Sequence, residues 1–277
     1  MQNLAVLTLS LVPTVLICVY VFWIDQVEKE PLWLLGLLMA AGALGYVPAR
    51  GLELAALSAL NKVFSSGLSY SLTGAVDYTS KAVLYVHHFL YSFVALALVQ
   101  WGIRWATLLL ITWRSKEFDC LFDGVVYAVF ASLGFSLCEN IFYVWRGGWG
   151  LILPRILAFL PVQVLLGIVL GCLYSGWRLY TLMEAEGRRR ELPEREQRVI
   201  SARKRRFAVL SFLLPVLLYG FYCWVELMGA LNMALIRGAW TVLMSAADVV
   251  LVLVFSSRDA YFTDLVSRRL NRQDRPQ

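Results

Sequence analysis

The stretch FDGVVYAVFASLGFSLCEN, residues 122–140, places a carboxylate and an amide, Glu139 and Asn140, inside an apolar run. Moving a carboxylate to the centre of a bilayer costs at least about 2.5–3.5 kcal/mol on insertion scales, so an acid there is rarely without a role. The run is long enough to contribute to one membrane-crossing helix. It therefore predicts a membrane helix that carries a functional or strongly buried polar pair.

Composition places the whole chain in the membrane. Of 277 residues, 60% are hydrophobic and only 16% are charged, whereas a soluble domain carries about 25% charged residues. The apolar runs do not alternate with polar residues as the strands of a membrane barrel do, so an all-α bundle is expected. Five cysteines show no spacing typical of a disulfide framework or a zinc site.

Seven apolar runs are long enough to cross the bilayer, and the first is read as a retained helix rather than a cleaved signal peptide. We found neither an internal repeat nor a separate soluble domain, so residues 1–277 are predicted to form a single membrane domain. The predicted spans are residues 3–24, 32–54, 82–113, 124–145, 151–175, 207–228 and 239–256.

Positive charge sets the predicted orientation. Residues 176–206 hold ten Lys and Arg, and the tail, residues 257–277, is also basic. Such segments stay in the cytoplasm, which gives a basic cytoplasmic loop, an outside N-terminus and a cytoplasmic C-terminus. Because the net charge of +6 is concentrated beside the membrane, the bilayer is an expected partner and nucleic acid is not.

Four polar side chains are predicted to lie at one depth. Counted from the cytoplasmic ends of their spans, they are about 12 to 15 residues in, roughly 18–23 Å at 1.5 Å per residue. Polar groups on four helices at one level suggest a polar pocket inside the bundle. The four are Gln100, Glu139, Gln163 and Tyr219.

Each of these residues also has a purely structural interpretation. Gln and Tyr in membrane helices often bond only to a neighbouring helix. Arg104, one turn from Gln100 on the same face, is a plausible partner for Glu139, and their pair could be a structural bridge. Asp248, with Ser245 on its face, is a second candidate polar site that could instead pair with Arg237 or the backbone.

The motifs resemble those of the PrsW-type intramembrane peptidase family, a group of glutamic-type membrane endopeptidases distantly related to the CAAX-type membrane peptidases. The likeness is carried by Asp123-Gly124-Val125-Val126-Tyr127, then by Gly134-Phe135 and Glu139-Asn140. An early Glu30-Pro31 also agrees with the family pattern. The resemblance implies supporting roles for Asp123, Gly134, Phe135, Asn140 and Arg104 around Glu139.

The departures from that pattern fall on titratable positions. The Glu-Glu-x-x-Arg position reads Gln100-Trp101-Gly102-Ile103-Arg104. Gln163 stands where a His is expected, and Tyr219-Gly220-Phe221-Tyr222-Cys223 replaces His-Gly-x-x-Asp. The resemblance therefore implies a peptidase scaffold with a largely substituted active site.

Neither a metal nor another cofactor is predicted. The only histidines, His87 and His88, lie about 18–20 Å from Gln100 along the same predicted helix. Zinc needs three or four converging ligands, and Cys138 and Glu139 are adjacent in sequence and point to different faces. A glutamic mechanism would use Glu139 as base, with Gln100, Gln163 or Tyr219 as hydrogen-bond donors.

Three functions follow from these patterns. The first is a peptidase-like protein that holds a membrane-anchored client in its pocket with lost or reduced proteolysis, using the small residues Gly167, Gly171 and Ser175 as a helix-binding face. The second, implied by the resemblance, is an active intramembrane endopeptidase that cleaves membrane-anchored regulators such as anti-sigma factors through Glu139. The third is a small-solute transporter, although no inverted repeat supports it. The expected location is the bacterial inner membrane, as a multi-pass protein.

Overall fold

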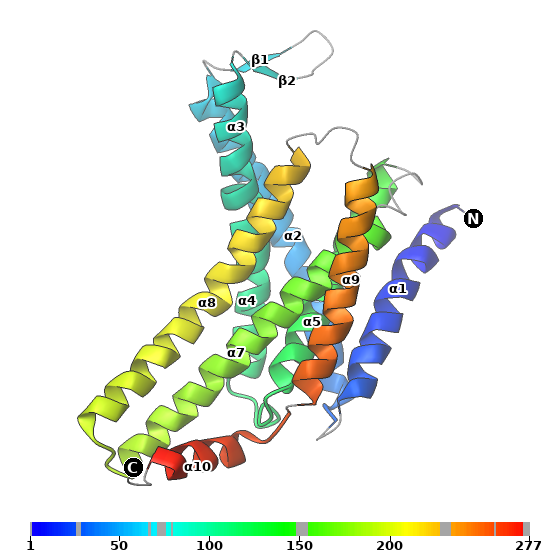
Figure 1. Cartoon of the computed structure of the whole chain (residues 1–277). Helices are drawn as coiled ribbons and strands as arrows, with labels where there is room; N and C mark the ends of the chain where they lie inside the picture. Colours follow the sequence, from blue (N-terminus) through cyan, green and yellow to red (C-terminus); the bar gives the residue numbers. More distant parts are fainter. Residues whose placement is uncertain are drawn as a thin grey trace.

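The chain folds as a bundle of long helices with one small hairpin (Figure 1). A computed structural model describes residues 2–25, 29–65, 68–70, 76–78, 80–147, 155–227, 234–257 and 259–273. The elements are α1 (Gln2–Ile24), α2 (Leu32–Val63), β1 (Leu68–Tyr70), β2 (Val76–Tyr78), α3 (Lys81–Leu90), the π-helical η2 (Tyr91–Leu98), α4 (Val99–Thr112), α5 (Asp123–Gly147), the π-helical η4 (Arg155–Phe159), α7 (Leu160–Arg189), α8 (Glu194–Leu227), α9 (Ala234–Ser256) and α10 (Phe262–Gln273).

Five of these helical stretches are long and apolar enough to cross a membrane. They begin at Leu32, Lys81, Asp123, Leu160 and Glu194. The described residues of α1 and α9 add two shorter apolar stretches, Leu11–Ile24 and Ser245–Ser256. A polytopic helical bundle is thus confirmed, while the number of seven spans and the orientation stay predictions.

Helix α5 is the centre of the bundle, packed among α1, α2 and α7 (Figure 1). Residues 123–140, which include Glu139 and Asn140, form most of this helix. In its most apolar stretch, 78% of the residues are buried. Two glycines allow the close approach to α2. A Cβ atom at Gly134 would collide with the carbonyl oxygen of Met39, and one at Gly42 would collide with that of Ala131.

The small residues of α7 pack against α5 in the same way. A Cβ at Gly171 would collide with the backbone of Gly124, and one at Gly167 would press on Val129. Ser175 is fully buried. This face was expected to receive a client helix; that expectation is wrong, because α5 already occupies it.

The third predicted span is one continuous rod, α3–η2–α4, and its middle is a π-helix. Outside the rod, α2 and α3 are joined through a short antiparallel hairpin in which Leu68 pairs with Tyr78 and Tyr70 with Val76. The π-helical turns widen the helix just before Gln100. Such segments are frequent at functional sites.

The basic segment 176–206 is not a loop. Helix α7 continues to Arg189 and α8 begins at Glu194, so only a short turn separates them. At 30 and 34 residues these helices are roughly 45 and 50 Å long, more than the ~30 Å hydrocarbon core needs. The expected loop conformation is therefore corrected to a helical hairpin that extends past the bundle (Figure 1).

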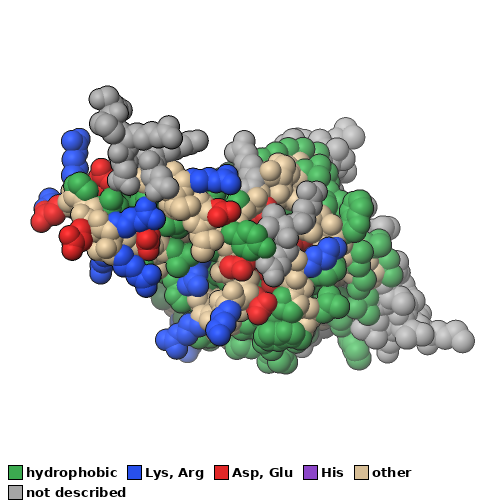
Figure 2. Space-filling model, turned by 90° about the horizontal axis from the view of Figure 1, so that it is seen from below, with side chains coloured by type: hydrophobic (Ala, Val, Ile, Leu, Met, Phe, Trp, Pro, Cys, Tyr) green, Lys and Arg blue, Asp and Glu red, His purple; other side chains and the backbone are tan. Residues whose placement is uncertain are grey.

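Charged side chains gather on this end of the molecule, as Figure 2 shows from below. Glu184 of α7 accepts hydrogen bonds from Lys204 at 2.7 Å and from Ser201, both on α8. The described part of the predicted basic tail is likewise largely helical. Its helix α10 packs against α7, and Arg269 donates to the hydroxyl oxygen of Tyr180 at 3.0 Å.

Candidate functional site

Glu139 and Asn140 lie in the last turns of α5, and one arginine binds both. The Arg155 guanidinium lies 3.2 Å from Glu139 Oε1, and its Nε donates to Asn140 Oδ1 at 2.7 Å. Glu139 and Asn140 are buried, and the Arg155 side chain is 16% exposed. The π-helical η4 presents this arginine at the start of α7. Sequence analysis had named Arg104 as the partner of Glu139, but the ion pair is made by Arg155.

Arg104 is buried close by and is held mainly by aromatic rings. Its guanidinium lies 3.8 Å from the ring centre of Phe135 and 4.7 Å from that of Trp101. One nitrogen donates to Gln100 Oε1 at 3.5 Å, while Nε and the second NH2 have no hydrogen-bond partner among the described residues. Glu139 and Tyr219 both interact with it electrostatically.

Gln100 connects this region to α2 through a carboxylate that sequence analysis missed. Its amide nitrogen donates to Glu53 Oε1 at 2.7 Å, and Arg50 donates to Glu53 Oε2 at 3.0 Å. Glu53 is 2% exposed. Its signal was a carboxylate near the end of an apolar run, but such a position is equally typical of the membrane surface.

The remaining two pocket candidates behave differently. Tyr219 is buried, hydrogen-bonds with Cys223 and interacts electrostatically with Glu139 and Arg104. Gln163 is fully buried, and neither its amide oxygen nor its amide nitrogen has a hydrogen-bond partner among the described residues. We therefore define the polar chamber as Glu53, Gln100, Arg104, Glu139, Asn140, Arg155 and Tyr219. Gln163 is not part of it, because it makes no hydrogen bond to any of these residues.

A groove opens beside the chamber between α2 and α5. It has a volume of about 560 Å³. Arg50, which binds Glu53, and Cys138, next to Glu139, both line it, so it runs along the chamber wall. Its other lining residues are Tyr46, Val47, Gly51, Ile141, Phe142 and Trp145.

Asp123 and Gly134, for which the family resemblance implied supporting roles, do not contact the chamber side chains directly. Asp123 begins α5, about 24 Å along the helix from Glu139, so it does not join the chamber. Gly134 sets the distance between α2 and α5. Both histidines also lie away from the chamber, on α3, where His87 contacts Asn61 at 3.0 Å and His88 contacts the carbonyl oxygen of Leu84 at 2.8 Å.

The structure shows no partner that would define the second candidate polar site, Asp248 on α9, among the described residues. Its side chain is buried, and Oδ1 has no hydrogen-bond partner among the described residues. The alternative partner Arg237 has a side chain outside the described part of the chain. Asp248 therefore stays a separate prediction.

A bundle of span-length apolar helices that buries a group of polar side chains defines a multi-pass membrane protein. The chain matches the family described as "PrsW family intramembrane metalloprotease" over residues 30–256. It belongs to the PrsW family.

Curated relatives agree with this assignment. Protease PrsW of Oceanobacillus iheyensis is 26% identical over 241 residues, which cover 87% of this chain and 91% of that protein. Protease PrsW of Bacillus subtilis is 28% identical over 136 residues, covering 48% of this chain and 53% of that protein. Protease PrsW of Geobacillus kaustophilus is 28% identical over 137 residues, covering 49% and 52%. No solved structure matches significantly.

The family description implies a metal ion, but the chamber does not fit one. Its two carboxylates are already bound, Glu139 to Arg155 and Glu53 to Gln100 and Arg50. The buried guanidinium of Arg104 adds a positive charge beside Glu139, and a cation would be repelled. Among the described residues, three His, Cys, Asp or Glu ligand atoms come together only at Asp119, Cys120 and Asp123, at the other end of α5.

Proposed function

We propose that this PrsW-family protein holds a segment of a membrane-anchored client at its polar chamber, with lost or reduced proteolysis. The bacterial plasma membrane is the proposed location, in keeping with the Bacillus-type relatives. One observation carries the proposal: the carboxylate that hydrolysis would need is neutralised by a guanidinium at 3.2 Å.

The chemistry of peptide hydrolysis explains why this matters. A general base must reach a water molecule, and its basicity falls when a cation is bound to it. The leaving amine must also be protonated, either by the same group or by a second acid. The other chamber carboxylate, Glu53, is occupied by Gln100 and Arg50. The family's metal chemistry has no ligand set in this chamber either.

Client binding, in contrast, has what it needs. The groove between α2 and α5 offers apolar walls to a helix or extended segment. Arg104 and Gln163 have hydrogen-bonding groups without a partner among the described residues, and such groups suit the backbone of a client segment. Each hydrogen bond made by a buried polar group lowers the free energy, because burying such a group without a partner is costly.

The test combines crosslinking with a cleavage assay. A photo-reactive amino acid replaces Val47 at the groove or, as a control, Leu110 on α4; both side chains face outward, at 67% and 83% exposure. Purified full-length protein is reconstituted with a defined panel of single-pass transmembrane segments. We expect intact segments to crosslink from position 47 and not from position 110, with no fragments formed.

The rival function is an active endopeptidase. Fragments of a panel member that disappear with Glu139→Gln, but persist with the exposed-site control Glu194→Gln, would overturn the loss of proteolysis. Equal crosslinking from both positions would overturn the groove as the binding surface. Solute flux across the same vesicles without any client would instead favour a transporter.

A further inference from the structure

Two arginines from different helices converge on one buried tyrosine at the end of α7 away from the chamber. Tyr180 of α7 is 6% exposed, and its hydroxyl oxygen accepts hydrogen bonds from Arg269 of α10 at 3.0 Å and from Arg203 of α8 at 3.4 Å. The two donor nitrogens are therefore no farther apart than these two distances together. Tyr180 lies roughly 30 Å along α7 from Leu160, which follows η4, so this group is separate from the chamber.

The group is rich in positive charge and hydrogen-bond donors and poor in acceptors. Within the described chain, neither Arg203 nor Arg269 forms an ion pair. The hydroxyl of Tyr180 accepts from both arginines, and its own hydrogen meets no acceptor among the described residues. Glu184, the next carboxylate along α7, is bound by Lys204 at 2.7 Å. Because like charges this close repel each other, the arrangement suits an anion that binds all three donors.

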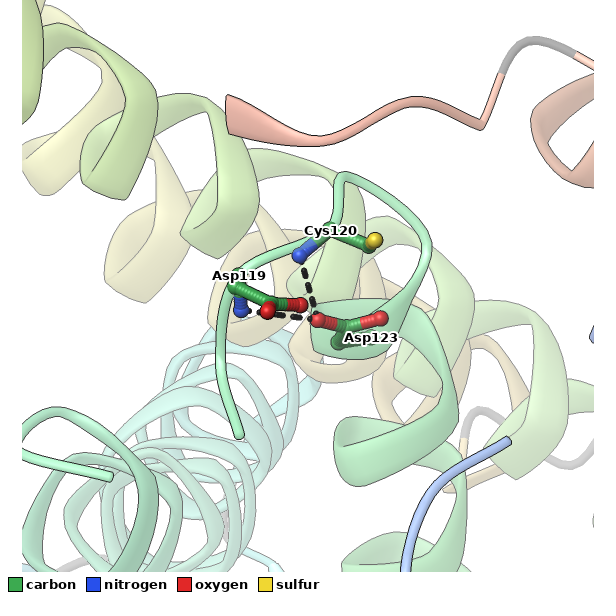
Figure 3. Close-up of side chains that lie close together, drawn as sticks. All are labelled: Asp119, Cys120 and Asp123. Carbon is green, nitrogen blue, oxygen red and sulfur yellow. Dashed lines mark hydrogen bonds between the residues drawn. The ribbon is translucent and has the colours of Figure 1, made fainter. Parts of the chain in front are cut away.

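The loop before α5 fixes the position of α10 and hence of Arg269. Asp123 accepts hydrogen bonds from the backbone N–H groups of Asp119 at 3.0 Å and Cys120 at 2.6 Å, which folds this loop (Figure 3). The folded loop binds the start of α10, since Phe262 N–H donates to the Asp119 carbonyl oxygen at 2.7 Å. Helix α10 is thereby held against α7 (Figure 1). Side chains that are already placed lose little conformational entropy when a ligand binds.

The group also lies at the level where the membrane surface is expected. The apolar stretch of α8 begins at Phe207, directly after a basic run that ends at Arg206. The Phe207 ring stacks on that of Tyr180, with the ring centres 5.3 Å apart. Tyr180 is therefore level with the edge of the apolar stretch. Tyrosine is enriched at this level of a bilayer, beside the lipid headgroups.

We propose that Tyr180, Arg203 and Arg269 bind the phosphate group of one anionic phospholipid. Guanidinium groups match the geometry of phosphate oxygens, and their hydrogen bonds to them are about 2.7–2.9 Å long. One phosphate group has enough oxygens to accept from both arginines and from the phenol. The bound lipid joins α7, α8 and α10, and its binding requires neither a client nor any chemistry at Glu139.

The surface above the group favours a lipid over a free anion. Leu210 and Leu217 lie two and four turns farther along α8 than Arg203, on the same face of the helix. Both leucine side chains are exposed, so they offer an apolar surface to the lipid's acyl chains. The basic segments place this end of the bundle on the predicted cytoplasmic side, where anionic headgroups attract Lys and Arg.

The test counts lipids bound to the purified full-length protein in a neutral detergent. Phosphatidylglycerol or phosphatidylcholine with the same acyl chains is titrated, and bound molecules are counted by native mass spectrometry. We expect one phosphatidylglycerol to bind at least about tenfold more tightly than phosphatidylcholine. The double variant Arg203→Gln with Arg269→Gln should weaken phosphatidylglycerol binding at least about tenfold.

The matched control is Arg205→Gln with Arg268→Gln. It removes the same charge from exposed positions on the same two helices, and should bind phosphatidylglycerol nearly as the unaltered chain does. Tyr180→Phe keeps the aromatic ring and should weaken binding less than the double variant. The melting temperature without lipid checks that each variant folds. Phosphatidylglycerol should raise the melting temperature of the unaltered chain and the control, but not of the double variant Arg203→Gln with Arg269→Gln.

Three results would contradict the proposal. An equal loss of affinity in the double variant and its control would mean that diffuse positive charge alone attracts the lipid. Equal affinities for the two lipids would mean that headgroup charge plays no part. Inorganic phosphate that binds as tightly as phosphatidylglycerol would make this a site for a free anion. Each result leaves the proposed function standing, because client crosslinking at the groove is measured separately.

Discussion

The interaction between Glu139 and Arg155 illustrates how one side chain can change what a site does. A buried carboxylate without a partner would be a strong base, because burial favours its protonated form. A carboxylate bound to a guanidinium is instead an ion pair that holds two segments together. Because Arg155 also binds Asn140, it fixes both members of the polar pair. The helices that position Glu139 are therefore present, but its carboxylate is engaged by Arg155.

Removing Arg155 should destabilise the protein more than removing a surface arginine. Arg155→Ala would leave Glu139 charged, buried and unpaired, which typically costs about 3–5 kcal/mol. The matched control Arg189→Ala breaks a pair with Glu186 in which the arginine side chain is 82% exposed, and should cost less than about 1 kcal/mol. Reversible unfolding in detergent measures both.

A double variant tests the cause of that loss. Glu139→Gln combined with Arg155→Ala should recover most of the stability, because the orphaned charge is gone. If Arg155→Ala unfolds under the same conditions as Arg189→Ala, the buried pair contributes nothing and its assignment is wrong.

Sequence reasoning located the acid but not the groups that bind it. Glu139 was evident because a carboxylate inside an apolar run is costly. Its partner was not, because Arg155 lies near the start of the fifth predicted span, where an arginine is equally typical of the membrane surface. The π-helical η4 places it beside Glu139. Glu53 was missed for a similar reason, as its depth depends on how far α2 extends.

At the scale of elements, close packing of α2, α5 and α7 positions the chamber. Glycines where α5 meets α2 and where α5 meets α7 let the backbones of these helices touch. The polar residues farther along the helices are therefore held at a fixed separation. The sequence predicted these helices and their order. It did not predict that Gly167 and Gly171 serve the interior, since small residues suit an internal partner and an external client equally well.

The α2–α5 contact gives a sharp comparison of two glycines. Gly134→Ala places a methyl group against the Met39 carbonyl oxygen, and backbone cannot rotate away, so we expect a loss of about 1–3 kcal/mol. Gly36→Ala on α2 meets nothing within 4 Å and should gain up to about 1 kcal/mol from helix propensity. Thermal unfolding of both variants measures the difference, and equal stability would mean that α2 and α5 are farther apart than described.

For the molecule as a whole, hydropathy predicted the bundle well, while helix ends depended on tertiary contacts. Charge alone made residues 176–206 look like a loop, yet Glu184 bonds Lys204 and Ser201 across the hairpin and keeps both helices intact beyond the apolar region. Runs of arginine report which side of a membrane a segment occupies. They do not report its conformation.

Thiol labelling in intact cells tests the orientation and the number of crossings together. Ser65→Cys lies just after α2, on the side predicted to face outward, and Arg189→Cys lies at the tip of the α7–α8 hairpin; both side chains are exposed. Three candidate spans separate them: the α3–η2–α4 rod, α5 and α7. The five native thiols are buried or half-buried, so an impermeant reagent should leave the unaltered chain unlabelled. We expect labelling of Ser65→Cys from outside and of Arg189→Cys only after permeabilisation. The reverse pattern would invert the orientation and keep the crossings, whereas labelling of both from one side would contradict the three crossings themselves.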